Sequence, residues 1–80
     1  HVPEINLYIE YRGQSCLKDL LRMFRFRQVK LLDIEITRAK GNDTLNACAI
    51  LTLRLNKNCT VEEVLEWVRT AKGVLTVEEL

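Results

Sequence analysis

Residues 5–26 read INLYIEYRGQSCLKDLLRMFRF and contain two hydrophobic periods in succession. In residues 5–11 every second side chain is apolar, which is typical of a strand with one buried face. Further along, apolar side chains recur three and four positions apart, as in an amphipathic helix; they are Leu17, Leu20, Leu21 and Phe24. Ser15 precedes this run and is the predicted N-cap of the helix. The stretch therefore predicts a strand followed by a helix.

The rest of the chain repeats this order. Residues 31–37 and 47–55 each alternate as strands, and Thr60 with Glu63 forms a Thr-x-x-Glu capping box that begins a second helix. Gly73 stands where the end of that helix favours a left-handed residue, and residues 74–77 form a short fourth strand. The turn-rich residues 38–46 predict a hairpin connection between the second and third strands.

This β-α-β-β-α-β order predicts an α+β fold, the ferredoxin-like sandwich, in which a four-stranded antiparallel sheet carries both helices on one face. Eighty residues suffice for a single domain, so we assign residues 1–80 to one unit. In the second strand, we expect Leu32, Ile34 and Ile36 to face one way and Leu31 the other. The predicted helix residues packed on the sheet are Leu17, Leu20, Leu21, Phe24, Val64, Leu65 and Val68.

Composition is that of a globular domain, with 48% hydrophobic residues, 29% charged residues and a net charge of +1. The chain has no overall excess of charge of the kind that would indicate nucleic acid or a membrane as its partner. Locally, basic residues interleave with two aromatic ones over Arg22, Phe24, Arg25, Phe26, Arg27 and Lys30. This pattern could form a phosphate-binding stripe, but its helical spacing favours a core face alternating with a solvated face.

The reactive residue types do not form a catalytic or metal site. The only histidine is His1, and the cysteines Cys16, Cys48 and Cys59 form no Cys-x-x-Cys pair, so we predict neither zinc nor another cofactor, and no enzyme activity. We expect these thiols to be reduced, in a cytosolic compartment. A cation site at Glu62, Glu63 and Glu66 is the alternative to a simpler role, in which these carboxylates complement the dipole at the start of the second helix. We favour the simpler role and expect no specific Mg²⁺ binding.

The sheet face away from the helices carries an apolar strip formed by Tyr8, Cys48 and Ile50, together with Leu31. Such strips commonly mark a partner surface, so we predict a weak homodimer through this face. One alternative is that these are scattered exposed residues of no special role. Another is that the homodimer forms through a strand edge or through the helices. Tyr8 is the one aromatic residue available there for stacking bases, so we expect no nucleic-acid partner.

The element order and residues 71–80 (AKGVLTVEEL) resemble ACT domains. These are ligand-sensing or dimerising modules attached to larger proteins, and their usual first loop reads Asp-x-Pro-Gly and contacts an amino-acid effector. The resemblance therefore implies a candidate ligand loop at Arg12, Gly13, Gln14 and Ser15, in which Gly13 alone matches the motif.

More specifically, residues 6–10 (NLYIE), 32–36 (LDIEI) and 49–55 (AILTLRL) look similar to the C-terminal domain of MgtC/SapB proteins. This resemblance implies a non-catalytic regulatory or interaction domain on the cytoplasmic side of a bacterial inner-membrane protein linked to magnesium homeostasis and virulence. The transmembrane region would precede His1, and the partner protein or small-molecule effector is unidentified. The alternative is an ACT-type amino-acid sensor carried by a soluble metabolic enzyme.

Overall fold

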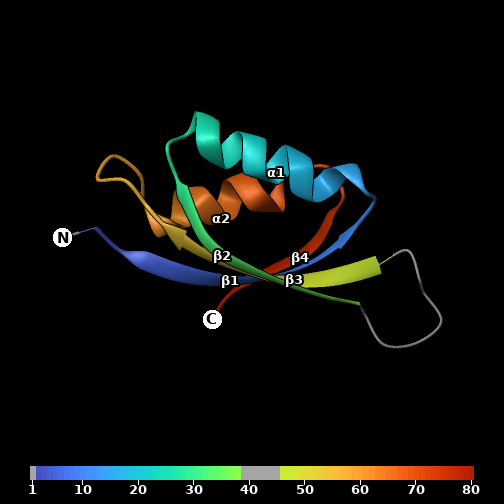
Figure 1. The fold of residues 1–80 in the computed structure, drawn as a ribbon. Coiled ribbons are helices and arrows are strands. Elements are labelled where there is room, and N and C mark those ends of the chain that lie inside the picture. Colours follow the sequence, from blue (N-terminus) through green and yellow to red (C-terminus); the bar gives the residue numbers. More distant parts are fainter. Residues whose placement is uncertain (1, 39–45) are drawn as a thin grey trace.

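The computed structural model describes residues 2–38 and 46–80, and its elements follow the predicted order (Figure 1). They are β1 (Glu4–Arg12), α1 (Ser15–Phe26), β2 (Lys30–Arg38), β3 (Asn46–Arg54), α2 (Val61–Arg69) and β4 (Val74–Glu79). Both predicted strand–helix–strand units are therefore present. Residues 39–45 of the predicted hairpin connection lie outside the described residues.

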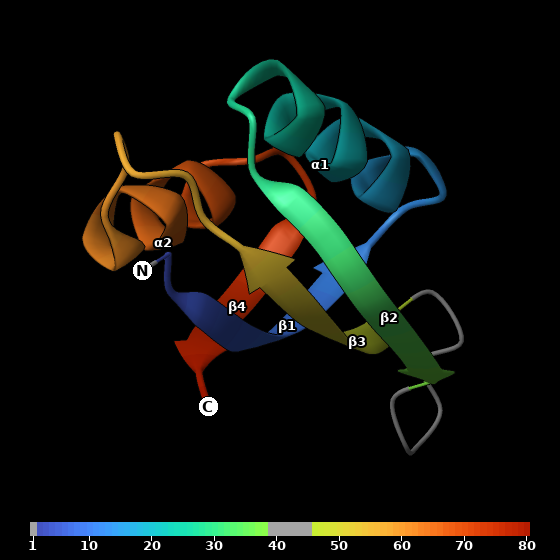
Figure 2. The ribbon, with the colours of Figure 1, turned by 60° about the vertical axis from the view of Figure 1, so that its left-hand side comes forward.

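The four strands form one antiparallel sheet in the order β2-β3-β1-β4, and both helices cover the same face of it (Figures 1 and 2). This arrangement confirms the ferredoxin-like α+β fold. β1 and β3 lie at the centre, and β2 and β4 are the two edges. In the central pair, Leu7 lies opposite Leu51 and Ile9 opposite Ala49, and all four side chains are buried beneath the helices.

The helices contribute a narrower set of core residues than predicted. Leu20 and Phe24 of α1 and Val64 and Val68 of α2 are almost completely buried, as expected. Leu17 and Leu65 are partly buried and also pack against this core, as expected. Leu21, however, is 36% exposed, so its assignment to the core was wrong. Successive helical residues are turned by about 100°, and the buried face of α1 is centred near Leu20 and includes Cys16, which leaves Leu21 at its border.

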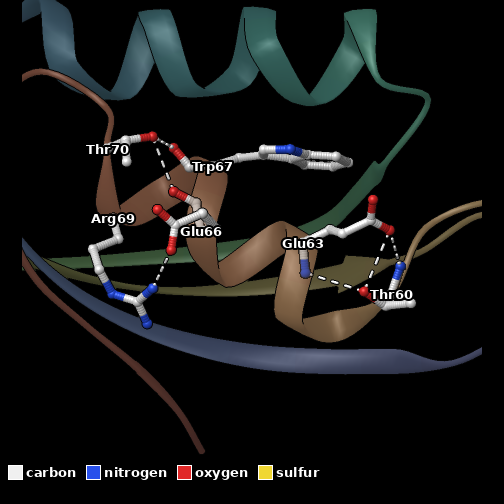
Figure 3. A network of polar contacts seen from close by, with 6 residues as sticks. All are labelled: Thr60, Glu63, Glu66, Trp67, Arg69 and Thr70. Carbon is white, nitrogen blue, oxygen red and sulfur yellow. Dashed lines mark hydrogen bonds and ion pairs between the residues drawn. The ribbon is translucent and has the colours of Figure 1, made fainter.

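The two helices begin differently. At α2, the Glu63 N–H donates to Thr60 Oγ1 over 3.1 Å and the Thr60 N–H donates to Glu63 Oε1 over 2.9 Å, which confirms the capping box (Figure 3). At α1 the N-cap is Gln14, which makes no side-chain cap bond, so the prediction of Ser15 was wrong by one position. Gln14 already has helical backbone angles, and Ser15 is consequently the first residue inside the helix.

α1 ends in a tight turn that places a side chain in the left-handed region. Gln28 has φ +60°, its N–H donates to the Arg25 carbonyl, and the Val29 N–H donates to the Phe24 carbonyl. This is the hydrogen-bond pattern of a Schellman motif, in which the left-handed position is usually a glycine. Asn56, from the loop after β3, donates from Nδ2 to the Arg27 carbonyl over 2.9 Å and holds this turn against the second half of the chain.

We predict that Gln28→Gly increases the free energy of unfolding by ~1 kcal/mol, because glycine adopts a positive φ without the steric cost that a Cβ imposes. Urea denaturation would measure the change, with Gln28→Ala as the control that keeps the Cβ and gains nothing. A loss of stability in Gln28→Gly would contradict the prediction.

A second pair of variants tests the core. Leu20→Ala should lower the free energy of unfolding by roughly 2–5 kcal/mol, because Leu20 is 1% exposed and its removal leaves a cavity. Leu21→Ala should cost less than ~1 kcal/mol, since the side chain already contacts water. Equal thermal shifts of the two variants would show that the face of α1 is assigned incorrectly.

Candidate functional site

The candidate ligand loop joins β1 to α1 and packs against the turn before β4. The Arg12 N–H donates to the Gly73 carbonyl over 2.8 Å, and the Cys16 N–H donates to the Gly13 carbonyl over 3.3 Å. A Cβ added to Gly73 would lie 2.6 Å from the Arg12 carbonyl oxygen and 3.2 Å from the side chain of Cys16. The end of β1 and the start of β4 are thus in direct backbone contact at this point.

Two glycines in this region have positive φ but different surroundings. Gly73 has φ +92°, as predicted, but α2 ends at Arg69 with Thr70 as its C-cap, so Gly73 belongs to the turn into β4 and not to the helix end. Gly13 has φ +99°, and a Cβ added there would meet no atom within 4 Å. Gly13, Gln14 and Ser15 are exposed, so the loop is accessible from solvent above Gly13.

Cys16 lies beneath this loop and is 2% exposed. Burial, with a smaller contribution from the carboxylate of Asp19, raises the pKa of the Cys16 thiol above its ordinary value. The thiol therefore stays protonated and acts as a small apolar packing group. Cys16, Cys48 and Cys59 are all free.

The open face of the sheet brings together three of the four residues of the predicted self-association face. Ile50 and Tyr8 lie side by side across β3 and β1, and the Tyr8 hydroxyl and the Cys48 thiol share a hydrogen bond of 3.1 Å. Tyr8 and Cys48 are half-buried, and Ile50 is 36% exposed. These residues form a small apolar centre on an otherwise polar face.

Carboxylates surround this centre. Glu35 pairs with Ile50 from β2 and Glu78 pairs with Tyr8 from β4, while Glu10 pairs with Cys48. The hydrogen bond to Cys48 is the largest of several causes that raise the pKa of Tyr8, and Glu10 and Glu78 add to it. The open face is therefore acidic as well as partly apolar.

Leu31 does not belong to this face, which corrects the prediction. The pairing of β2 with β3 shifts register between Leu31 and Asp33, so that Leu31 lies opposite the buried Leu53 and packs against the core on the helix side. Asp33 lies opposite Thr52 on the open face, and Leu32, also expected among the inward residues, is the extra residue of the bulge. The two consecutive leucines ahead of Asp33 are the sequence signal that could have indicated a change of phase.

The β2 edge exposes apolar residues that the sequence alone did not single out. Ile36 lies opposite Ala49 on the helix side but is 56% exposed, and Leu32 and Leu21 are each 36% exposed. A groove of about 510 Å³ runs between α1 and the start of β2 and is lined by Leu21, Phe24, Arg25, Gln28, Val29, Lys30 and Leu31. Helical or strand periodicity identifies the face of a residue but not whether its strand is an edge.

Two of the three carboxylates considered for a cation site already have partners within α2. Glu63 accepts the hydrogen bonds of the capping box, and Glu66 forms an ion pair of 2.6 Å with Arg69 (Figure 3). Within residues 2–38 and 46–80, no group of three or more histidine, cysteine or acidic side chains could hold a metal ion. In the same residues, no helix has the length and apolar character needed to cross a membrane.

Solved structures of two kinds share this architecture over the whole chain. The crystal structure of the ACT domain from GTP pyrophosphokinase of Chlorobium tepidum matches with a TM-score of 0.74 and 14% identity, covering 100% of both chains. The solution structure of the C-terminal domain of the MgtC protein from Mycobacterium tuberculosis matches with a TM-score of 0.74 and 12% identity, covering 99% of this chain and 86% of that one. The chain has the ACT-like ferredoxin fold.

The structural similarity to both the MgtC domain and ACT domains agrees with the resemblance drawn from the residues. No family model and no curated protein matches the sequence of this ACT-like domain. At 12–14% identity, the shared feature is the fold, and function has to be argued from the surfaces of this chain.

The two glycines of the first-loop region provide a matched test of its packing. We predict that Gly73→Ala lowers the free energy of unfolding by roughly 2–5 kcal/mol, combining ~1–2 for a side chain in the left-handed region with ~1–3 for overpacking. Gly13→Ala should cost only the first part, ~1–2 kcal/mol, since space above it is open. Chemical denaturation of both variants would show the difference, and a larger loss at Gly13 would contradict the packing described here.

Proposed function

We propose that this chain is a non-catalytic regulatory or interaction domain of an MgtC/SapB-type bacterial inner-membrane protein linked to magnesium homeostasis and virulence. It would face the cytoplasm, with the membrane-spanning region upstream of residue 1. The structural match to the MgtC C-terminal domain over 99% of this chain supports this proposal, together with the resemblance of residues 6–10, 32–36 and 49–55. The domain would work by binding another protein surface, and we propose a weak homodimer.

The observation that carries the interaction role is the exposed apolar edge at β2. Among the residues that the structure describes, β2 has a neighbour on one side only, so the backbone groups of its outer side are available for pairing with another strand. Ile36 and Leu32 on this strand and Leu21 on α1 add exposed apolar surface along the same edge. Antiparallel pairing of two β2 strands about a twofold axis would satisfy the backbone groups and remove these side chains from water.

The open sheet face is less suited to a symmetric dimer. A twofold contact centred on Tyr8 and Ile50 would bring Glu10, Glu35 and Glu78 of one copy close to the same residues of the other. Like charges facing each other across an interface oppose association, and the apolar centre between them is small. Pairing at the β2 edge keeps Glu10 and Glu78 of the two copies apart, although Asp33 and Glu35 lie on β2 itself. The apolar side chains of Ile36 and Leu21 lie on the helix side of the sheet, away from these carboxylates.

The second candidate function is amino-acid sensing at the loop formed by Arg12, Gly13, Gln14 and Ser15. The open space above Gly13 favours it, because a ligand could approach the backbone there. Titration of the chain with the standard amino acids, followed by amide NMR, would test this candidate. Saturable shifts centred on Gly13 support sensing, and their absence leaves protein interaction as the function.

We predict that Ile36→Glu shifts the chain from dimer to monomer in sedimentation equilibrium, because it places a charge on the β2 edge. Ile50→Glu makes the same change on the open face and should leave the dimer intact. Both residues are at least 36% exposed, so the melting temperature should change little in either variant. Loss of the dimer in Ile50→Glu alone would show that the open face is the interface, and a monomeric parent chain at millimolar concentration would contradict self-association.

A further inference from the structure

The outer surface of α1 carries the basic and aromatic residues singled out in the sequence, and the structure separates their roles. Phe24 is 1% exposed and belongs to the core, as expected if a core face of the helix alternates with a solvated face. Phe26, in contrast, is 83% exposed. One exposed apolar side chain is common on a protein surface, so the weight of Phe26 comes from the charged and apolar residues beside it.

Three cations lie on one outward stripe of α1, because Lys18, Arg22 and Arg25 are spaced by four and three residues. Exposed apolar side chains lie on both sides of the stripe. Leu21 lines the groove toward β2, and Phe26 lines a separate hollow with Asp19, Arg22, Met23 and Arg27. The surface therefore combines a row of positive charge with apolar groups at its borders.

The positive charge of this stripe is largely unneutralised. Asp19 is the one acidic residue of α1 and forms an ion pair of 3.6 Å with Arg22. Neither Lys18 nor Arg25 has an ion-pair partner among residues 2–38 and 46–80. Lys30, at the start of β2, lines the same groove as Arg25 and Leu21.

Other surfaces of the domain carry the opposite charge, although the net charge of the chain is only +1. The open sheet face presents five carboxylates, those of Glu4, Glu10, Asp33, Glu35 and Glu78, against the cations Arg12 and Arg54, of which Arg54 is ion-paired with Glu4. The helix α2 begins with Glu62 and Glu63. The molecule is therefore electrically polarised, with α1 as its cationic side. Such a charge distribution orients a protein at an anionic surface.

We propose that the outer surface of α1 docks onto an anionic lipid bilayer. Lys18, Arg22 and Arg25 contact the phosphate groups of the lipid headgroups, and Phe26 enters the interfacial region, while the acidic sheet face points to the aqueous side. The inference goes beyond the proposed self-association and uses a surface that meets the proposed dimer surface only at Leu21, and it needs no assumption about what precedes residue 1.

A bilayer fits this surface better than a nucleic acid does. Single-stranded nucleic acids are bound by several aromatic side chains that stack successive bases, whereas α1 exposes one phenylalanine. Cations flanked by exposed apolar side chains are typical of surfaces that combine electrostatic attraction to anionic lipids with shallow apolar insertion. The cations alone or the apolar side chains alone would bind a bilayer weakly, and the two contributions add when both are present.

The test is cosedimentation of the purified 80-residue chain with vesicles of phosphatidylcholine alone or mixed with phosphatidylglycerol. We expect binding only to the mixed vesicles, decreasing as salt is raised. Arg22→Glu with Arg25→Glu should weaken binding by at least ~25-fold, at about fivefold for each cation lost. The matched control, Lys57→Glu with Lys72→Glu, makes the same charge change at exposed residues outside α1 and should retain affinity within about twofold.

Phe26→Ser should lower the affinity severalfold without changing the salt dependence, because it removes only the apolar contribution. Circular dichroism would show that each variant is folded. Equal losses in the α1 variant and its control, equal binding to uncharged vesicles, or tighter binding to single-stranded RNA than to anionic vesicles would each overturn the proposal. Sedimentation without lipid reports the dimer separately, so failure here would leave the proposed function standing.

Discussion

The pairing of β1 with β3 determines where every other element lies. Ile5, Leu7 and Ile9 face Leu53, Leu51 and Ala49 across these two strands, and their side chains form the buried strip on which both helices rest. Both strands are interior to the sheet, so each is buried by helices on one face and bonded on both sides. In the described part of the chain β2 and β4 have one neighbour each, which makes them the positions where a second chain can add.

Strict alternation along the central strands also decides the character of the opposite face. Uncharged residues lie between the core positions at the middle of β1 and β3. Tyr8 shares a hydrogen bond with Cys48, Thr52 donates one to Asn6, and Ile50 lies between these two pairs. The charges of this face come from the ends of the central strands, where Glu4 pairs with Arg54 and where Glu10 and Arg12 lie, and from the edge strands. The outer surface of α1 carries a net positive charge. The two sides of this small domain therefore differ in charge and suit different partners.

The sequence predicted the elements well where the determining interactions are local. The order of strands and helices, the capping box at Thr60 and Glu63 and the inward residues of β1 and β3 depend on neighbours within a few positions, and all were correct. The register of β2 depends on its pairing with β3, so Leu31 was placed on the wrong face. Leu21 and Ser15 were each misplaced because a helical face and a helix start can be displaced by one residue without changing the pattern. The exposure of Ile36 depends on how far the helices extend over the sheet, which periodicity does not encode.

The position of β1 has a consequence for synthesis of the protein on the ribosome. Among the six elements β1 is translated first, yet one of its two neighbours in the sheet, β4, is translated last of the six, with Leu7 pairing to Glu79. Until β4 emerges from the exit tunnel, one side of the central strand stays unpaired, and the contact between Arg12 and Gly73 cannot form. Because such non-local contacts have to wait for β4, the nascent domain completes its sheet only after nearly all of its residues have been released.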